Sequence, residues 1–177
     1  MADGVQPADV LPGHRVVLRR AGAEGDGALL DGLFAVPEVA ELWPGDNSDH
    51  LHEPGTVGFT VWVGDGFIGF IQYWEEPAPE YRHAGIDVVL HPDWCNQGLG
   101  TDAVRTLARH LFDDLGHHRI VIDPRVENRR AIASYRKVGF RDVGIMRRYE
   151  RGNDGVLRDG LLMDLLPEEL TRGSDGR

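Results

Sequence analysis

The stretch of sequence that best indicates the fold is residues 97–101, which read Gln97-Gly98-Leu99-Gly100-Thr101. Its glycines allow backbone N–H groups to turn toward one point, and the N-terminus of a following helix adds about half a positive charge there. Such a loop favours the binding of a pyrophosphate. Tight turns between a strand and a helix also use glycine for steric reasons alone, so the loop by itself leaves both interpretations open.

The residues after the loop form an amphipathic helical pattern. Between residues 101 and 115, apolar side chains recur at intervals of three and four: Val104, Leu107, Ala108, Leu111 and Phe112. No Gly-Lys-Ser/Thr follows the glycines, as a nucleotide P-loop requires. Ala103 permits only the alanine variant of the dinucleotide-binding motif, and the order of the predicted elements does not support that motif.

The other elements are predicted from apolar periodicity and from the positions of glycine and proline. Predicted strands cover residues 14–20, 58–63, 67–74, 84–91, 119–123, 141–148 and 156–165. Predicted helices cover residues 27–43 (split at Pro37), 101–115 and 128–138. This order predicts a mixed α/β sheet domain with too few parallel βαβ units for a dinucleotide fold. We expect one domain over residues 13–170, with flexible tails at 1–12 and 171–177.

The composition is that of an ordinary soluble globular protein. Of the 177 residues, 41% are apolar and 27% are charged. No apolar run approaches the roughly 20 residues that span a membrane, and the N-terminus lacks a signal-peptide pattern. Cys95 is the one cysteine and has no partner for an internal disulfide. We therefore expect a cytoplasmic protein that does not bind membranes.

The charge is distributed unevenly along the chain. The net charge is −10 overall; residues 1–80 carry 14 acidic side chains against three arginines, whereas residues 105–151 carry 11 arginines and Lys137 against six acids. This asymmetry fits either solvated faces of opposite sign or an enzyme that binds an anionic cofactor on its basic half and a cationic acceptor near its acidic half. An acidic chain argues against nucleic-acid binding, which requires a basic face.

A second motif lies about thirty residues after the glycine loop. Asn128, Ala131, Tyr135, Gly139 and Phe140 have the spacing N-x-x-A-x-x-x-Y-x-x-x-G-F. With the loop and the order of elements, this pattern resembles the GNAT superfamily of N-acetyltransferases over most of the chain. The resemblance implies the GNAT fold, an α/β fold with a mixed, mostly antiparallel sheet, splayed central strands and flanking helices. It also implies acetyl-coenzyme A as co-substrate.

The resemblance assigns a set of cofactor-binding residues. They are Val88, Val89, Leu90, Asn96, Gln97, Gly98, Leu99, Gly100, Thr101, Asn128, Ala131 and Tyr135. Where the family has glutamine or arginine before the glycines, this chain has Cys95, which lacks a strong donor for phosphate. Asn96, Gln97 and Thr101 are nearby substitutes. No metal ion is expected, because the adjacent His117 and His118 cannot easily face one ion.

The resemblance also implies direct attack of a neutral amine on the thioester. Asp87 is expected to bind the amine and accept its proton. Its neighbours form an apolar alternation that directs it to the opposite face; that face could be solvent, but the resemblance implies that it is the acceptor cleft. The backbone N–H of Val88 or Val89 would stabilise the oxyanion. Tyr135 would protonate the departing thiolate; the alternative is an ordinary core tyrosine.

Several segments resemble one subfamily, the aminoglycoside 6′-N-acetyltransferases. These segments are residues 41–43, 68–72, 85–87, 98–101, 123–124 and 128–140. The resemblance implies that Trp43, Gln72, Asp87 and Asp123 contact the drug, and Trp74 and Asp159 are further candidates. A polycation with many hydroxyls suits acidic and aromatic side chains. The segment 75–83 is shorter than in similar enzymes, which leaves the drug range and regiochemistry open.

Other acceptors remain open: another small polyamine or hydroxylated amine, or a protein N-terminus. The non-enzymatic alternative is a GNAT domain that binds coenzyme A without turnover, against which Asp87 and Tyr135 argue. The sequence is compatible with a monomer or a homodimer.

Overall fold

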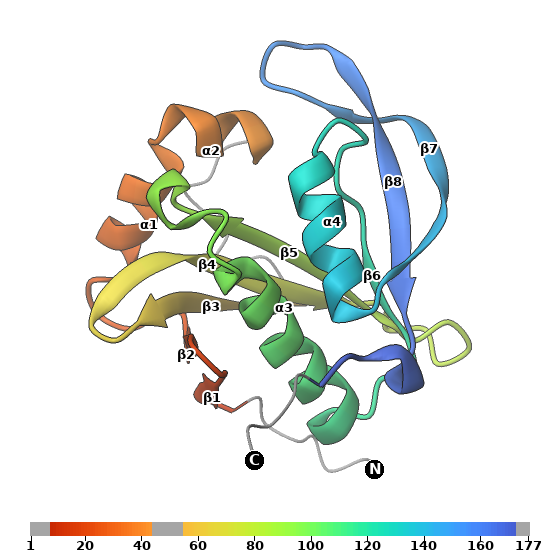
Figure 1. Ribbon diagram of the computed structural model, residues 1–177, viewed down its shortest axis with the longest axis horizontal. Coiled ribbons are helices and arrows are strands. Elements are labelled where there is room, and N and C mark those ends of the chain that lie inside the picture. Colours follow the sequence, from red (N-terminus) through yellow and green to blue (C-terminus); the bar gives the residue numbers. More distant parts are fainter. Residues whose placement is uncertain (1–7, 44–54, 173–177) are drawn as a thin grey trace.

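The computed structural model describes residues 8–43 and 55–172, which form one eight-stranded sheet with helices packed on it (Figure 1). The strands are β1 (Val10–Pro12), β2 (Val17–Arg20), β3 (Thr56–Val63), β4 (Gly66–Glu75), β5 (Ala84–Leu90), β6 (Ile120–Ile122), β7 (Arg141–Arg151) and β8 (Leu157–Leu165). The helices are α1 (Asp26–Phe34), α2 (Pro37–Leu42), α3 (Leu99–Arg109) and α4 (Arg129–Val138). The order in the sheet is β1-β2-β3-β4-β5-β6-β8-β7, and among these described strands only β5 and β6 pair in parallel. No helix among the described residues is long and apolar enough to cross a membrane.

The N-terminal tail is shorter than the sequence predicts. Residues 10–12, expected within a flexible tail, form β1 and pair antiparallel with β2. Leu11 is buried there opposite Leu18. This packing holds the segment in a strand, although Pro12 and Gly13 favour a turn. At the other end, the Thr171 N–H donates to the Val138 carbonyl at 2.9 Å. The remaining predicted tail residues, 1–7 and 173–177, lie outside the described residues.

The centre of the sheet is splayed, as the resemblance implies. β5 pairs with β6 only at Ala84↔Ile120 and Gly85↔Val121. Because β6 ends after three residues, where the chain turns away at Asp123-Pro124, residues 86–90 of β5 pair with β4 on one side but with no described strand on the other. An open backbone edge therefore lies in the middle of the sheet, where an extended ligand can pair with it.

The core lies on both faces of this sheet. The larger cluster packs the sheet against α3 and α4, and a smaller one of Leu30, Leu33, Phe34, Val39, Phe70 and Val89 lies under α1 and α2. Ile86, Val88 and Leu90 of β5 pack on the larger cluster, whereas Val89 belongs to the smaller one. Since side chains alternate along a strand, Asp87 shares the α1–α2 face with Val89. The predicted alternation is confirmed.

A buried carboxylate fixes the start of α3 against the sheet. Asp102, in the first turn of α3, accepts hydrogen bonds from the backbone N–H groups of Arg15 at 2.7 Å and Val16 at 3.0 Å. Gly13 is needed beside it, because a Cβ there would lie 2.6 Å from Thr106 Oγ1. The start of α3 is thus held against the segment that leads into β2.

Candidate active site

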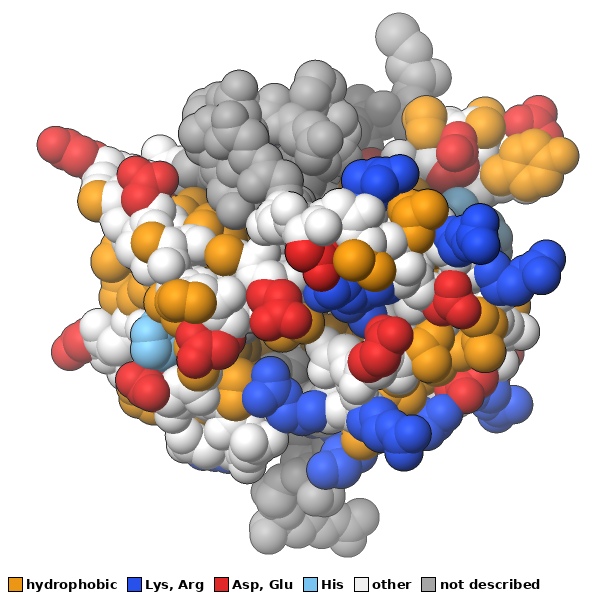
Figure 2. Space-filling view, turned by 90° about the horizontal axis from the view of Figure 1, so that it is seen from above, with side chains coloured by type: hydrophobic (Ala, Val, Ile, Leu, Met, Phe, Trp, Pro, Cys, Tyr) orange, Lys and Arg blue, Asp and Glu red, His pale blue; other side chains and the backbone are white. Residues whose placement is uncertain are grey.

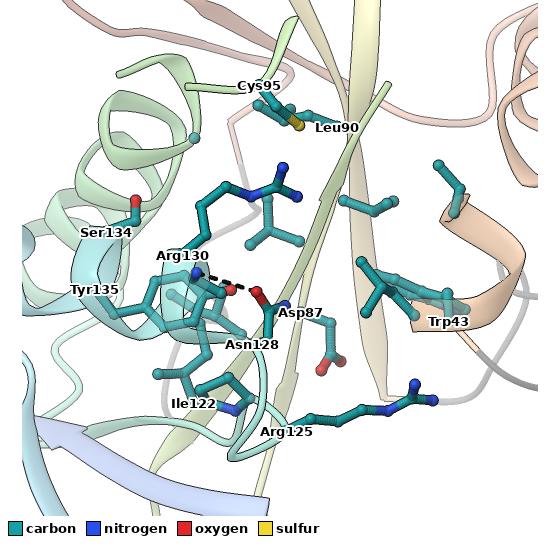
Figure 3. A pocket seen from close by; sticks show the side chains of 18 of the residues that line it. Trp43, Asp87, Leu90, Cys95, Ile122, Arg125, Asn128, Arg130, Ser134 and Tyr135 are labelled. Atoms are coloured by element: carbon teal, nitrogen blue, oxygen red, sulfur yellow. Dashed lines mark hydrogen bonds between the residues drawn. The ribbon is translucent and has the colours of Figure 1, made fainter. Parts of the chain in front are cut away.

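A cavity of about 900 Å³ opens where β5 separates from β6 (Figure 3). It extends from α2, past the open edge of β5, to the first turns of α3 and α4. The predicted site residues that line it are Trp43, Gln72, Asp87, Val88, Val89, Leu90, Asn96, Gly98, Gly100, Thr101, Asp123, Asn128, Ala131 and Tyr135. Residues far apart in the sequence therefore meet around one space.

One end of the cavity has the features of an anion site. Asn96 and Gly98 both have a left-handed backbone, with φ of 61° and 78°, and no side chain caps α3. The first backbone bond of this turn runs from Asp102 N to Gly98 O, at 3.1 Å. The N–H groups of residues 99–101 precede it, so they have no acceptor inside the helix. These donors and the helix dipole suit a pyrophosphate.

Two predicted residues contribute to this end only through their backbone. Leu99 is buried in the core, and the side-chain amide of Gln97 donates to the Asp93 carbonyl at 3.1 Å. Thr101 Oγ1 lies 2.6 Å from Ser134 Oγ, which joins the first turn of α3 to α4. Of the three side chains that could replace the missing glutamine or arginine, Asn96 and Thr101 therefore remain.

Arg130 is a residue at this end that the motif analysis did not single out. It lines the cavity from α4, and its side chain extends toward Cys95 and Leu90 (Figure 3). A guanidinium is a strong donor for phosphate, of the kind that Cys95 lacks. The basic pair Arg129-Arg130 inside the second motif was the available signal.

Asn128 serves two purposes at the start of α4. Its Oδ1 accepts a hydrogen bond from Ala131 N at 3.2 Å, so Asn128 is the N-cap of α4. Because the cap uses the oxygen, the Nδ2 donor is directed elsewhere, and Asn128 lines the cavity. A ligand along the open edge of β5 can accept from it.

The N–H groups of successive residues in β5 point alternately toward β4 and toward the open edge. His91 N donates to the Ile68 carbonyl of the neighbouring β-hairpin at 2.8 Å. In an antiparallel pair, hydrogen-bonded and non-hydrogen-bonded positions alternate. Val89, two residues from His91, therefore directs its N–H to β4, whereas Val88 and Leu90 direct theirs toward the cavity. Of the two predicted oxyanion donors, only the Val88 N–H has the required direction.

Gln72 and Asp87 form a polar pair at the other end of the cavity. They are cross-strand neighbours, and Gln72 Nε2 donates to Asp87 Oδ2 at 3.2 Å. Gln72 is only 5% exposed, and its Oε1 has no hydrogen-bond partner among the described residues. Since the carboxylate requires the amide nitrogen on its side, this oxygen is an unsatisfied buried acceptor, which costs about 1–3 kcal/mol unless a donor reaches it.

Tyr135 projects from α4 toward β5 (Figure 3). Its ring packs against Phe140, with centroids 6.1 Å apart. Burial raises the pKa of Tyr135 well above its ordinary value, and the carboxylates of Asp87 and Asp123 raise it further. The hydroxyl is therefore protonated at neutral pH and can act as a hydrogen-bond donor within the cavity that Asp87 also lines.

The wall at the end of β6 is joined to β7. The Tyr149 hydroxyl donates to Asp123 Oδ2 at 2.9 Å, and Arg125 Nε donates to Glu150 Oε1 at 2.9 Å. Burial raises the pKa of Asp123, and the Tyr149 hydrogen bond partly opposes this effect. Burial, with the nearby Asp123 carboxylate, raises the pKa of Tyr149 to about 12. The sequence did not indicate Arg125, Tyr149 and Glu150 as site residues. Tyr149 and Glu150 come close to Asp123 and Arg125 only through the pairing of β7 with β8.

The opposite wall is α2. Trp43, at its end, packs against Phe34 and Phe70 with centroid distances of 5.5 and 6.0 Å. Glu38 and Glu41 line the cavity from the same helix. In the view of Figure 2, Asp and Glu side chains run across the left and centre of the molecule, whereas Lys and Arg gather at the lower and right-hand sides. Inside the cavity, Glu38 and Glu41 line the wall at α2, whereas Arg130 and Lys137 line the wall at α4.

Trp74 and Asp159 are not among the described residues that line the cavity. The Trp74 indole lies over Gly85, where an added Cβ would be 2.1 Å from the ring, and it contacts His83. Trp74 still shares a strand face with Gln72. Asp159 accepts a hydrogen bond from Arg148 N on β7.

Comparison with known proteins agrees with this geometry. Residues 31–140 match the Acetyltransferase (GNAT) family. The chain is 35% identical to the ribosomal protein bS18-alanine N-acetyltransferase of Escherichia coli over 83 residues (45% of this chain, 53% of the relative). It is 41% identical to the aminoglycoside N(6′)-acetyltransferase type 1 of Klebsiella pneumoniae over 83 residues (46% of this chain, 37% of the relative). The chain thus spans about half or less of the length of these relatives.

A solved structure extends the similarity to the whole fold. AAC(6′)-Ib in complex with paromomycin and acetyl-coenzyme A superimposes with a TM-score of 0.72 and 27% identity, covering 90% of this chain and 98% of that one. The fold class expected from the sequence is confirmed.

Proposed function

The chain belongs to the acetyltransferase (GNAT) family, and from this premise we propose that it transfers the acetyl group of acetyl-coenzyme A to the 6′-amine of an aminoglycoside. The observation that carries the proposal is the Gln72–Asp87 pair, a carboxylate and an unsatisfied amide oxygen lining one cavity with the open edge of β5. A protonated or hydroxylated acceptor would supply a donor to Gln72 Oε1 and a cationic partner for the carboxylate.

Acetyl-coenzyme A fits the basic part of the cavity. Its pyrophosphate would lie on the N–H groups of residues 99–101, with Arg130 beside it. The pantetheine arm, with its amides, would extend along the open edge of β5 and exchange hydrogen bonds with Val88 and Leu90. Asn128 Nδ2 is an additional donor from α4. This places the thioester near Asp87 and Tyr135.

The chemistry is one acyl transfer with two proton movements. The amine nitrogen forms a bond to the acetyl carbon while Asp87 accepts its proton, directly or through water. The Val88 N–H stabilises the oxyanion of the tetrahedral intermediate. The bond from carbon to sulfur then breaks, and Tyr135, which lines the cavity, donates its proton to the departing thiolate.

The acceptor is proposed from the charge of the other part of the cavity. Five carboxylates line it: Glu38, Glu41, Asp87, Asp123 and Glu150. Glu150 is paired there with Arg125. Several carboxylates around a small cavity suit a compact polycation better than a peptide with a single terminal amine. The similarity to aminoglycoside acetyltransferases supports the same acceptor.

A protein N-terminus is the second candidate, favoured by the similarity to the bS18-alanine acetyltransferase. The two candidates are separated by measuring coenzyme A release with a kanamycin-type drug, spermidine and an alanine-terminated peptide. The proposal predicts the highest kcat/KM for the drug, at least tenfold above the other two. A preference for the peptide would replace the aminoglycoside with a protein acceptor, and no turnover with any amine would indicate a non-catalytic domain.

A further inference from the structure

The β7–β8 hairpin has an irregular segment beside the acidic part of the cavity. Met146 pairs with Gly160 and Glu150 pairs with Arg158, so residues 147–149 all face the single residue Asp159. Such a bulge bends a strand and changes the direction of its side chains. Here it accounts for the shape of one cavity wall.

The bulge contains a strained backbone position. Arg148 has φ of 51°, in the left-handed region that residues other than glycine rarely adopt. A conformation of this kind persists only where neighbouring groups stabilise it. The Arg148 N–H donates to Asp159 Oδ1 at 2.7 Å, which is the contact that can do so.

Asp159 also connects the bulge to the loop that carries Asp123. Its backbone carbonyl accepts a hydrogen bond from Val126 N at 3.0 Å, and the next residue, Gly160, forms a bridge with Arg125. One residue of β8 thus contacts both segments that make up this wall.

The bulge has a direct effect on Tyr149 and Glu150. Consecutive residues of a regular strand point to opposite faces, yet both of these residues line the cavity. The Tyr149 ring lies over Gly160, where a Cβ would be 3.0 Å from Cδ1, and its hydroxyl reaches Asp123. Glu150 meanwhile bonds Arg125. Without the bulge, these two contacts could not form together.

We propose that Asp159 is a positioning residue for the acceptor site: it stabilises the β7 bulge that places Tyr149 and Glu150 in the cavity wall, and it does not contact the acceptor. The inference rests on the proposed acetyl transfer to an amine. It replaces the expectation from the sequence that Asp159 binds the substrate. Arg147 and Arg148 line a surface hollow with Asp159, so its surroundings do not favour a cation.

Two substitutions separate positioning from direct contact. Asp159→Asn removes the charge but keeps an oxygen that can accept from Arg148 N, so the KM for the acceptor should stay within threefold of wild type. Asp159→Ala removes the acceptor oxygen and should raise that KM at least tenfold, with the KM for acetyl-coenzyme A changed less than twofold. Equal losses in both variants would mean that Asp159 binds the cationic acceptor through its charge and would overturn the proposal.

A rescue variant tests the strained backbone itself. Glycine adopts positive φ without steric cost, so adding Arg148→Gly to Asp159→Ala should restore most of the acceptor KM. A direct contact could not be restored in this way, and a double variant no better than the single one would contradict the proposal. The double variant also provides the test if Asp159→Ala alone does not fold, which thermal unfolding will reveal.

Asp154→Ala is the matched control. Asp154 also accepts a backbone N–H within this hairpin, from Val156 at 3.1 Å, but it is exposed and is not among the described cavity residues. Asp154→Ala should leave the KM for the acceptor unchanged. If it raised this KM as much as Asp159→Ala does, the effect of Asp159→Ala would be a general loosening of the hairpin. A wild-type protein that acetylates no amine would overturn the proposed function, whereas normal turnover by Asp159→Ala would overturn this inference alone.

Discussion

Replacing Val88 with proline tests the role of the open edge of β5. The Val88 N–H faces the cavity, on the side of β5 where no described strand pairs with it at this position. Proline removes this donor without breaking a bond of the sheet, which is the situation in which strands tolerate proline. Loss of one oxyanion donor typically lowers kcat by about 10²–10³. The cost to folding should be about 1 kcal/mol, the range of strand propensity.

Val89→Pro is the matched control one residue away. The Val89 N–H is directed to Phe70 on β4, so proline there leaves a buried carbonyl of the sheet without its donor. Adding about 1–3 kcal/mol for that group to the propensity loss gives a destabilisation of about 2–4 kcal/mol. Val88→Pro should therefore react slowly but stay stable. Val89→Pro should be unstable but keep a near-normal rate per folded molecule.

Urea unfolding and single-turnover rates at saturating substrates measure both quantities. Calorimetric titration with coenzyme A would show whether Val88→Pro still binds the donor. A Val88→Pro protein that folds, binds coenzyme A and keeps kcat within threefold of wild type would refute the assignment of the Val88 N–H to the reaction.

Three further substitutions test the rest of the site. Asp87→Asn should lower kcat by about 10²–10⁴, the usual contribution of a general base, with calorimetric acetyl-coenzyme A affinity unchanged; a normal kcat would remove Asp87 from catalysis. Tyr149→Phe removes the hydrogen bond that lowers the pKa of Asp123, so this pKa should rise further. Since a cationic acceptor needs the carboxylate, the acidic limb of the pH profile of kcat/KM should move to higher pH, and an unmoved limb would contradict this role. Gly85→Ala inserts a methyl group 2.1 Å from the Trp74 ring; overpacking should cost about 1–3 kcal/mol in thermal or urea unfolding, and unchanged stability would contradict the packing.

The elements around the cofactor end could be predicted because their signals are local. The alternation along β5 shows which face is buried, and this information places Asp87 opposite Ile86 and Val88. Likewise, Asn128 and Gly139 lie where the ends of α4 need a cap and a stop. Such signals depend on neighbours within a few positions of the chain.

The features that the sequence did not reveal depend on pairing between distant segments. β1 consists of three residues, and Leu11 becomes part of the core only because β2 lies beside it. The bulge of β7 is centred on Arg148, which carries none of the usual signals for a positive φ, and it is defined by the register with β8. The placement of Tyr149 and Glu150 in the cavity wall follows from that register.

The acetylation of neomycin and paromomycin, which differ only in carrying a 6′-amine or a 6′-hydroxyl, tests the proposed reaction most directly. Both drugs present the same remaining charges to the acidic wall. In the proposed reaction, only the 6′-amine of neomycin attacks the thioester carbon and gives its proton to Asp87. The account predicts acetyl-coenzyme A-dependent modification of neomycin at N6′, with kcat/KM for paromomycin lower by at least a hundredfold. Equal rates with the two drugs, or an acetyl group on another nitrogen of neomycin, would contradict it.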